Sequence, residues 1–524
     1  MRGSLRARLQ TLRWFAPAGV LFTALRAPSF LEPHWYTDEA SYVSVARGLL
    51  RGKVLYTQIW NNKPPLQSWT VALVVRLFGS SEAALHLLTF VAGGLAVAAV
   101  AWAAWHLLTS RRAAVAAIVA AALLGLPILD AELAIPESLL IAPLSWAGAI
   151  LLVNLDPRSQ RPLRRVELWP VAVGALTAAA IAYQQTALAE TGAFALAMLL
   201  SRRARLRDLA AFLGVVVAIT GAWVAVAVLQ AGAGHVGFAL VGFYVAYTQS
   251  VFPATPGGVV AHLAEVMCGS VLLIGGAWLL RRSRSLTWVM VLWAGASLLV
   301  AAVSKQPYAH YLTPAVVPLA LLVASVPAPT RLRALRSDTF VRSAPQITGL
   351  VVAASMASVA GLDWVPFAAP SAQLNTYRNL GMYYGGAVAQ MRADWEDSFD
   401  ARVAADSAVA DWLQGEGLNG STAVVWSSDA WLYALADLDE QMPTPPIYND
   451  EVLLGINGPV ADLVDTLSPT LIIVSDDAAV QFPEIKSLLD GSKYLQVYAS
   501  APDTVWLRGD VVASLGSLPG QTLR

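Results

Sequence analysis

The sequence predicts a mainly α-helical, polytopic membrane protein that carries a small C-terminal α/β domain. Two observations point to this class. Of the 524 residues, 56% are hydrophobic and only 13% are charged, and the mean hydropathy is +0.56. An ordinary soluble enzyme has about 25% charged residues. Long apolar runs also recur from Trp14 to about Leu362 and then stop. A run of about 20 such residues is long enough to cross the hydrocarbon core of a bilayer.

The formal net charge of zero conceals two oppositely charged parts. Residues 1–362 hold 28 Lys and Arg against 13 Asp and Glu, a net charge of +15, whereas residues 363–524 hold 7 against 22, a net charge of −15. A basic membrane part suits contact with anionic lipid headgroups, and an acidic tail argues against a nucleic-acid partner. We therefore expect a transmembrane domain over 1–362 and a separate domain over 363–524. The one cysteine, Cys268, cannot form a disulfide framework.

The distribution of arginine predicts the topology. The apolar runs predict about eleven spans, at 14–31, 84–108, 113–130, 137–154, 167–183, 185–200, 208–230, 259–280, 286–303, 311–327 and 345–362. A cytoplasmic N-terminus gathers 21 of the 35 positive residues in cytoplasmic segments. This count requires that residues 65–78, which follow Pro64-Pro65, form an interfacial or re-entrant helix. The first outer loop, 32–83, and the C-terminal domain are then extracytoplasmic.

The first outer loop contains an acidic pair. Thr37 is a suitable N-cap, and apolar residues recur at helical spacing, so we expect a helix over 38–50. Asp38 and Glu39 then occupy its first turn, where the helix dipole favours acids. They also follow the first span directly, and a carboxylate at the lipid boundary can accept a proton from a hydroxyl held within hydrogen-bond reach. Both interpretations stay open from the residues alone.

Further acids occur at the outer ends of later spans. Asp130, Glu132 and Glu137 lie close together, and Pro136 before Glu137 is typical of a helix start. They are either solvated helix caps or a second acidic group of the site. Glu190 lies within an apolar run, where an ionised acid is unfavourable by about 2.5–3.5 kcal/mol, so it either lines a cavity or reaches the interface. Glu265 has the same ambiguity.

Residues 304–314 set a lysine, a histidine and two tyrosines at an outer helix junction: Lys305, Tyr308, His310 and Tyr311. Together with Lys63 and Arg26 they could bind a phosphate. The alternative is a lysine that reaches the interface and tyrosines of the aromatic belt. The histidines, His86 among them, show no ligand-like spacing, and we expect no metal site. Asp476-Asp477 follows an expected strand and is interpreted as a loop.

These motifs resemble those of the membrane GT-C glycosyltransferases, in particular the group with the protein O-mannosyltransferases and the transferase that attaches aminoarabinose to lipid A. The resemblance rests on an uncleaved first span, Asp38-Glu39, Lys63-Pro64-Pro65, and three later segments at 134–140, 183–187 and 307–314. In the tail, 423–426 and 431–433 are similar to the extracytoplasmic domain of bacterial members. Gln184 departs from many relatives, which have lysine there.

The resemblance implies an inverting transfer of one sugar from a polyprenyl-phosphate carrier to a hydroxyl, with no nucleotide-sugar and no further cofactor. It implies that Asp38 is the catalytic base, that Lys63 contacts the carrier phosphate and that Glu137 is a second acid in the cavity. The residues expected to bind substrate are Glu39, Lys63, Gln185, Glu190, Lys305, Tyr308, His310 and Tyr311. The expected partners are membrane lipid, the lipid-linked donor and a hydroxyl acceptor in protein, lipid or cell-wall glycan.

Two other classes remain open on the sequence. A transporter or lipid flippase would share the spans and a polar cavity, although it typically shows two related halves. A non-catalytic assembly protein of the same fold would tolerate loss of Asp38. For the tail we expect a helix over 403–413 and strands near 422–426, 470–474, 494–498 and 504–507.

Overall fold

The computed structural model describes residues 2–156, 168–250, 271, 286–303, 308–325, 370–445 and 460–515. Lys305, Glu265, most of the predicted span 259–280 and all of 345–362 lie outside these residues, as does the predicted domain boundary at 362. The chain divides into two compact units, which are described separately. The first comprises 1–30, 86–224 and 253–373, and the second comprises 31–85, 225–252 and 374–524.

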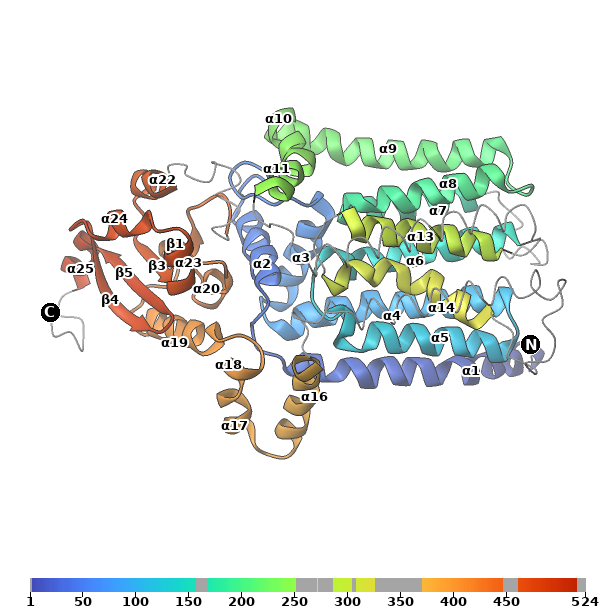
Figure 1. Cartoon of the computed structure of the whole chain (residues 1–524), viewed down its shortest axis with the longest axis horizontal. Coiled ribbons are helices and arrows are strands. Elements are labelled where there is room, and N and C mark those ends of the chain that lie inside the picture. Colours follow the sequence, from blue (N-terminus) through green and yellow to red (C-terminus); the bar gives the residue numbers. More distant parts are fainter. Residues whose placement is uncertain are drawn as a thin grey trace. The chain divides into compact units, whose positions relative to one another are not determined.

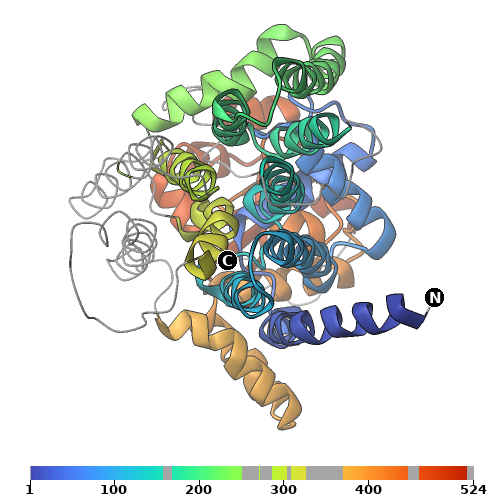
Figure 2. The same cartoon turned by 90° about the vertical axis from the view of Figure 1, so that its right-hand side faces the viewer.

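The first unit consists of helices, which run lengthwise in Figure 1 and several of which are viewed nearly end-on in Figure 2. They are α1 (Arg2–Arg26), α4 (Glu82–Leu107), α5 (Ser110–Gly125), α6 (Pro136–Leu155), α7 (Trp169–Tyr183), α8 (Leu188–Leu200), α9 (Leu206–Ala231), α13 (Thr287–Val303) and α14 (Val316–Ser325). Among the described residues three helices, α4, α6 and α9, are long and apolar enough to cross a membrane. Shorter apolar helices, including α7, α8 and α13, accompany them.

Small residues allow the helices of this unit to pack closely. Its buried core is rich in alanine, above all on α4 and α5. Gly148 on α6 faces Trp293 on α13, and a Cβ atom at this position would overlap the Trp293 ring. Close backbone approach at small residues is the usual way in which helices pack in a bilayer. The helix starts and breaks follow local signals as expected, since α6 begins at Pro136 and α7 ends before Gln184, which has extended backbone.

The second unit begins with the first outer loop. It contains α2 (Thr37–Leu50) and α3 (Pro65–Phe78). The expected helix over 38–50 is therefore present, but Thr37 is its first residue rather than its N-cap, and the N-cap Tyr36 makes no side-chain capping bond. α3 has 14 residues, about 21 Å of helix, which is shorter than a hydrocarbon core. Residues of 225–252, with α10 (Ala233–Gly237) and α11 (Phe243–Ser250), share a buried apolar cluster with the loop between α2 and α3.

The C-terminal part of this unit is a five-stranded sheet with the order β2-β1-β3-β5-β4. The strands are β1 (Thr422–Trp426), β2 (Asp439–Glu440), β3 (Leu471–Ser475), β4 (Tyr494–Ser500) and β5 (Asp503–Arg508). β1 is parallel to β2 and β3, whereas β5 is antiparallel to β3 and β4. All four expected strands are confirmed, and the two-residue β2 is too short to leave a pattern in the sequence.

Helices accompany the strands of this α/β domain. They are α16 (Pro370–Tyr384), α17 (Val388–Ala393), α18 (Trp395–Ser398), α19 (Arg402–Gly415), α20 (Trp431–Leu435), α22 (Val460–Leu467), α23 (Asp476–Gln481), α24 (Ile485–Leu489) and α25 (Gly509–Leu515). The helix expected over 403–413 is confirmed as α19. The loop expected at Asp476-Asp477 is wrong, because these residues open α23 directly after β3.

Within the second unit, α2 is joined to the sheet by charged side chains. Lys53, just after α2, has its Nζ 2.9 Å from Asp439 Oδ1 and also contacts Glu440. Arg51 Nη1 lies 3.3 Å from Glu440 Oε2. Burial raises the pKa of Glu440, and the charges of Lys53 and Arg51 oppose that rise. The basic residues of the first outer loop therefore meet the acidic edge of the C-terminal domain at β2.

Replacing Lys53 with Met should lower the apparent unfolding temperature of the detergent-solubilised protein by several degrees. The buried Glu440 carboxylate would lose a partner, at about 1–3 kcal/mol, and about 1 kcal/mol shifts a melting temperature by roughly 2–4 °C in a domain of about 200 residues. Lys486→Met, which removes an exposed lysine on α24, is the control and should change the temperature little. Equal melting of both variants in differential scanning fluorimetry would contradict this role of Lys53.

Candidate active site

The predicted site residues fall in both units, and each group is described within its own unit. In the second unit, the first turn of α2 carries both acids of the loop. Asp38 is half-buried, and Glu39 is completely buried. The acidic pair is therefore not a solvated cap on an exposed helix. Because a buried carboxylate needs a compensating partner, full burial of Glu39 indicates a specific electrostatic role for this position.

Lys63 is held at the start of α3 by a tightly bonded loop. The Tyr56 hydroxyl donates to the Lys63 carbonyl at 2.9 Å, and the Lys63 amide donates to Asn61 Oδ1 at 3.2 Å. Tyr56 has a φ of 73°, a backbone conformation that is unfavourable for a non-glycine residue, and it is stabilised there by its hydrogen bonds and burial. The loop thus fixes the backbone of Lys63 before the two prolines start the helix.

The Lys63 side chain is 9% exposed. Its Nζ lies 3.0 Å from the Tyr244 hydroxyl on α11 and 5.4 Å from the centre of that ring. A phenol neither neutralises an ammonium group nor removes its charge. The contact orients the Lys63 ammonium group, and Tyr244 is a partner that the sequence did not indicate.

In the first unit, Glu137 is buried and bonded to a glutamine. Gln184 Nε2 donates to Glu137 Oε1 at 2.6 Å. Gln184 is the residue that replaces the lysine of many relatives, and the structure shows that it keeps a hydrogen bond to this acid while leaving the carboxylate without a countercharge from that position. Gln185, the residue predicted to bind substrate, lies beside it in a short 3-10 helix and is half-buried.

The other acids of this unit also have partners. Arg26 Nη1 lies 3.3 Å from Glu132 Oε2, and both side chains are buried. His310 Nδ1 lies 3.6 Å from Asp130 Oδ2. Of the two alternatives left open for these acids, that of solvated caps does not apply to Glu132 and Glu137, which are 4% and 2% exposed. Arg26, which was suggested to help Lys63 bind a phosphate, contacts Glu132 and Thr89 through its guanidinium, and its phosphate role stays a prediction.

Glu190 lies in the first turn of α8 and accepts a hydrogen bond from Ser297 on α13 at 2.8 Å. It is 1% exposed, so its carboxylate is enclosed by the protein. Tyr308, His310 and Tyr311 form one aromatic cluster, in which the rings of Tyr308 and His310 stack with 5.3 Å between centroids. Lys305, which was expected beside them, lies outside the described residues.

A cavity of about 670 Å³ lies within the second unit, among the end of α2, α3 and residues 227–230. Its lining is mainly apolar, with polar groups from Lys53, Arg76 and Gln230. Asp38, Glu39 and Lys63 are not among the lining residues. This cavity therefore does not contain the three site residues predicted in the first outer loop.

The C-terminal domain holds a further buried acid. Asp429 Oδ1 accepts the Trp431 amide at 2.9 Å, and Trp431 packs edge-on against His34 of the first outer loop, with 4.4 Å between ring centroids. Burial raises the pKa of Asp429 to about 7, although the Arg402 charge and the Trp431 amide lower it. Asp429 thus lies where the C-terminal domain supports the segment that leads into α2.

The free energy of unfolding should fall as the pH rises from 3.8 to about 7, the range in which Asp429 keeps its proton only in the folded protein. The folded protein keeps a proton on this carboxyl up to about pH 7, whereas the unfolded chain releases it above the ordinary value of 3.8. Because the folded state binds more protons in this window, the free energy of unfolding decreases with increasing pH. The apparent unfolding temperature should be higher at pH 5.5 than at pH 8.

Asp429→Asn keeps the oxygen that accepts the Trp431 amide but removes the titration. This variant should lose part of the pH dependence and be stabilised at pH 8. Asp490→Asn, at an exposed position, provides the control and should behave as the wild type. An unchanged pH profile in Asp429→Asn would show that other groups cause the effect.

Comparison with known proteins agrees with the predicted resemblance. Residues 62–228 match the family model described as dolichyl-phosphate-mannose-protein mannosyltransferase. No curated protein matches the chain. The crystal structure of ArnT from Cupriavidus metallidurans in the apo state is similar with a TM-score of 0.61 and 18% identity, over 98% of this chain and 100% of that chain.

The structure of the same ArnT bound to undecaprenyl phosphate gives a TM-score of 0.60 and 18% identity, over 97% and 99% of the two chains. The oligosaccharyltransferase AglB from Archaeoglobus fulgidus is also similar, with 10% identity over 96% of this chain and 75% of that chain, but its TM-score of 0.48 is too low to support an argument. The likeness to ArnT shows that the described part of this chain shares the fold of that protein, which agrees with the expected multi-pass membrane protein.

Proposed function

Starting from a chain with the GT-C fold of ArnT, we propose that this protein is an inverting glycosyltransferase. It moves a single sugar from a polyprenyl-phosphate carrier to a hydroxyl acceptor on the outer face of the membrane. The observation that carries the proposal is the fold likeness over 97% of the chain to a protein crystallised with undecaprenyl phosphate. The match to the mannosyltransferase family model over 62–228 supports it independently.

Asp38 has the position and chemistry of the base. In the reaction, the acceptor oxygen attacks the anomeric carbon, the bond from that carbon to the phosphate oxygen breaks, and the hydroxyl proton passes to the Asp38 carboxylate. Asp38 lies in the first turn of α2, where the helix dipole favours a negative charge. General-base catalysis of this kind contributes about 10²–10⁴-fold. Glu137 is proposed as a second acid of the reaction cavity.

Lys63 supplies positive charge to the leaving group. A polyprenyl phosphate is already a stable anion, so it needs electrostatic stabilisation rather than a proton donor. The Lys63 side chain is largely desolvated and oriented by Tyr244, and a preorganised cation acts most strongly where water is excluded. Glu39, Gln185, Glu190, Lys305, Tyr308, His310 and Tyr311 remain proposed substrate contacts.

The C-terminal domain is proposed to position the first outer loop. Ser44 of α2 donates to the Ala430 carbonyl at 3.1 Å, and the Trp60 amide donates to the Pro443 carbonyl at 2.7 Å. Glu32, ahead of α2, accepts hydrogen bonds from Trp35 and from Thr376. These contacts lie within one compact unit, so the orientation of α2, and with it Asp38, depends on the C-terminal domain.

The direct test is a transfer assay in membranes that contain the protein. Radiolabelled polyprenyl-phosphate mannose and polyprenyl-phosphate arabinose are supplied in parallel, and label is followed into protein, lipid and wall-glycan fractions. Membranes with the protein should transfer one of the sugars, whereas membranes from a deletion strain should not. Transbilayer movement of the labelled lipid without glycosyl transfer would instead favour a flippase, and would overturn the proposal.

A further inference from the structure

The cavity of about 670 Å³ in the second unit has no part in the chemistry proposed above. All of its lining residues belong to this one unit. Its volume falls in the range of about 300–1,000 Å³ that is usual for the binding sites of small molecules. Leu49, its first lining residue, follows Asp38 by about three turns of α2, roughly 16 Å along the helix. The proposed base is therefore remote from the cavity.

The walls of the cavity are mainly apolar and continue onto an exposed face of α3. Trp69 and Leu73 line the cavity and are also 42% and 56% exposed. Leu77, one turn after Leu73, and Phe78 are exposed as well. An exposed apolar face of this kind on a short helix of a membrane protein is typical of contact with lipid. An acyl chain that lies along this face can extend into the cavity.

The polar groups of the cavity include two cations. Arg76 lies in the last turn of α3 and is exposed, and Lys53 comes from the loop after α2. Lys53 is already bonded to Asp439 and Glu440. Arg76 is therefore the group that an incoming anion would contact, and a guanidinium binds a phosphate group through two parallel hydrogen bonds. The cavity thus combines an apolar space with an accessible positive charge.

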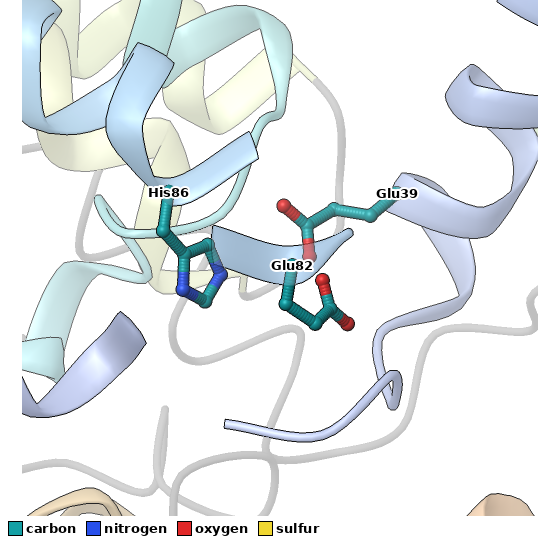
Figure 3. A group of neighbouring side chains, drawn as sticks. All are labelled: Glu39, Glu82 and His86. Atoms are coloured by element: carbon teal, nitrogen blue, oxygen red, sulfur yellow. The ribbon is translucent and has the colours of Figure 1, made fainter. Parts of the chain in front are cut away.

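The charges at the two ends of α2 also favour an anion at the cavity rather than beside the proposed base. The first turn of α2 holds Asp38 and Glu39, and the buried Glu39 carboxylate faces that of Glu82, the first residue of α4 (Figure 3). The other end of α2 borders the cavity, together with Lys53 and Arg76. Because like charges repel, a negatively charged head group is accommodated better at the second end.

We propose that this cavity binds an anionic phospholipid of the surrounding bilayer. One acyl chain occupies the apolar space, and the phosphate contacts Arg76. The polyprenyl carrier fits the cavity less well, because its isoprenoid tail has no anion for Arg76 to bind. Its phosphate is proposed to bind Lys63, which lies ahead of α3, whereas Arg76 lies in the last turn. The bound phospholipid holds α3 against the end of α2.

The test measures lipid binding and needs no glycosyl transfer, so its result is independent of the proposed function. The full chain is purified and delipidated in detergent and titrated with phosphatidylglycerol or phosphatidylcholine, and bound lipid is counted by native mass spectrometry. The wild type should bind phosphatidylglycerol at a one-to-one ratio. Arg76→Gln should weaken this binding by about 5-fold or more, the effect expected of one arginine at a membrane surface. Arg76→Lys should retain most of it.

Two further variants locate the site. Leu73→Asn places a polar group in the apolar wall and should weaken the binding of both lipids. Arg111→Gln is the matched control, because Arg111 is an exposed arginine at the start of α5 that does not line the cavity. It should bind phosphatidylglycerol as the wild type does.

Equal binding of phosphatidylglycerol by Arg76→Gln and wild type would refute the proposal. Equal binding of phosphatidylglycerol and phosphatidylcholine by the wild type would also refute it, because the head group would then not be recognised by its charge. Undecaprenyl phosphate is the competitor. If it displaced phosphatidylglycerol and were itself bound more weakly by Arg76→Gln, the cavity would belong to the carrier, and the proposal would be wrong.

Discussion

Asp38→Asn should lower the rate of sugar transfer by about 10²–10⁴-fold, the usual contribution of a positioned general base. Asparagine has nearly the same shape as aspartate but cannot take the proton of the acceptor hydroxyl. The side chain is half-buried in the first turn of α2, so the substitution should leave the fold intact. The measurement is initial transfer velocity from a labelled polyprenyl-phosphate sugar at saturating donor.

The control for this prediction is Asp411→Asn, which changes an exposed carboxylate on α19 and should transfer sugar at the wild-type rate. The unfolding temperatures of both variants should stay close to that of the wild type, so that a loss of rate reflects chemistry. If Asp38→Asn turned over the donor as fast as the wild type, Asp38 would not be the base, whatever fold the chain has.

Lys63→Met should weaken the use of the lipid-linked donor by about 10–100-fold. The substitution keeps the aliphatic stem but removes the charge, and hydrogen bonds to charged groups contribute about 1.5–3 kcal/mol, with about 1.4 kcal/mol for each factor of ten. The effect should appear mainly as a higher KM for the donor, whereas the dependence on acceptor concentration changes little. Donor titrations at fixed acceptor concentration measure this difference.

Tyr244→Phe separates the charge of Lys63 from its orientation. This variant removes the hydroxyl that lies 3.0 Å from Lys63 Nζ but retains both the cation and the aromatic ring. We expect a smaller loss of donor use than in Lys63→Met. A donor dependence in Lys63→Met that is identical to that of the wild type would remove the phosphate role from this lysine.

Local patterns predicted most of the individual elements. Pro136 marks the start of α6, and the Gln184-Gln185 pair marks the break between α7 and α8. The four longer strands of the tail are at their expected positions because short apolar runs between turn residues are a local signal. The N-cap of α2 was misassigned by one residue, since a helix end depends on backbone geometry that a residue type only favours.

The pairing of the site residues could not be predicted, because each pair joins distant segments. Arg26 and Glu132 are 106 residues apart, and Glu137 and Gln184 are 47 residues apart. The local sequence does not indicate which acid pairs with which hydrogen-bond donor.

The sequence by itself determined that this chain is a membrane protein, which parts are apolar helices, and which family its first outer loop resembles. These properties follow from composition and short-range periodicity, which are encoded residue by residue. The tertiary structure alone decided that the basic residues after α2 meet the acidic edge at β2, that Arg26 neutralises Glu132, and that Glu39 and Glu82 face each other in a buried place. Such contacts depend on packing between segments far apart in the chain. A buried charge without a partner is strongly unfavourable, so burial favours the packing in which each charge is paired.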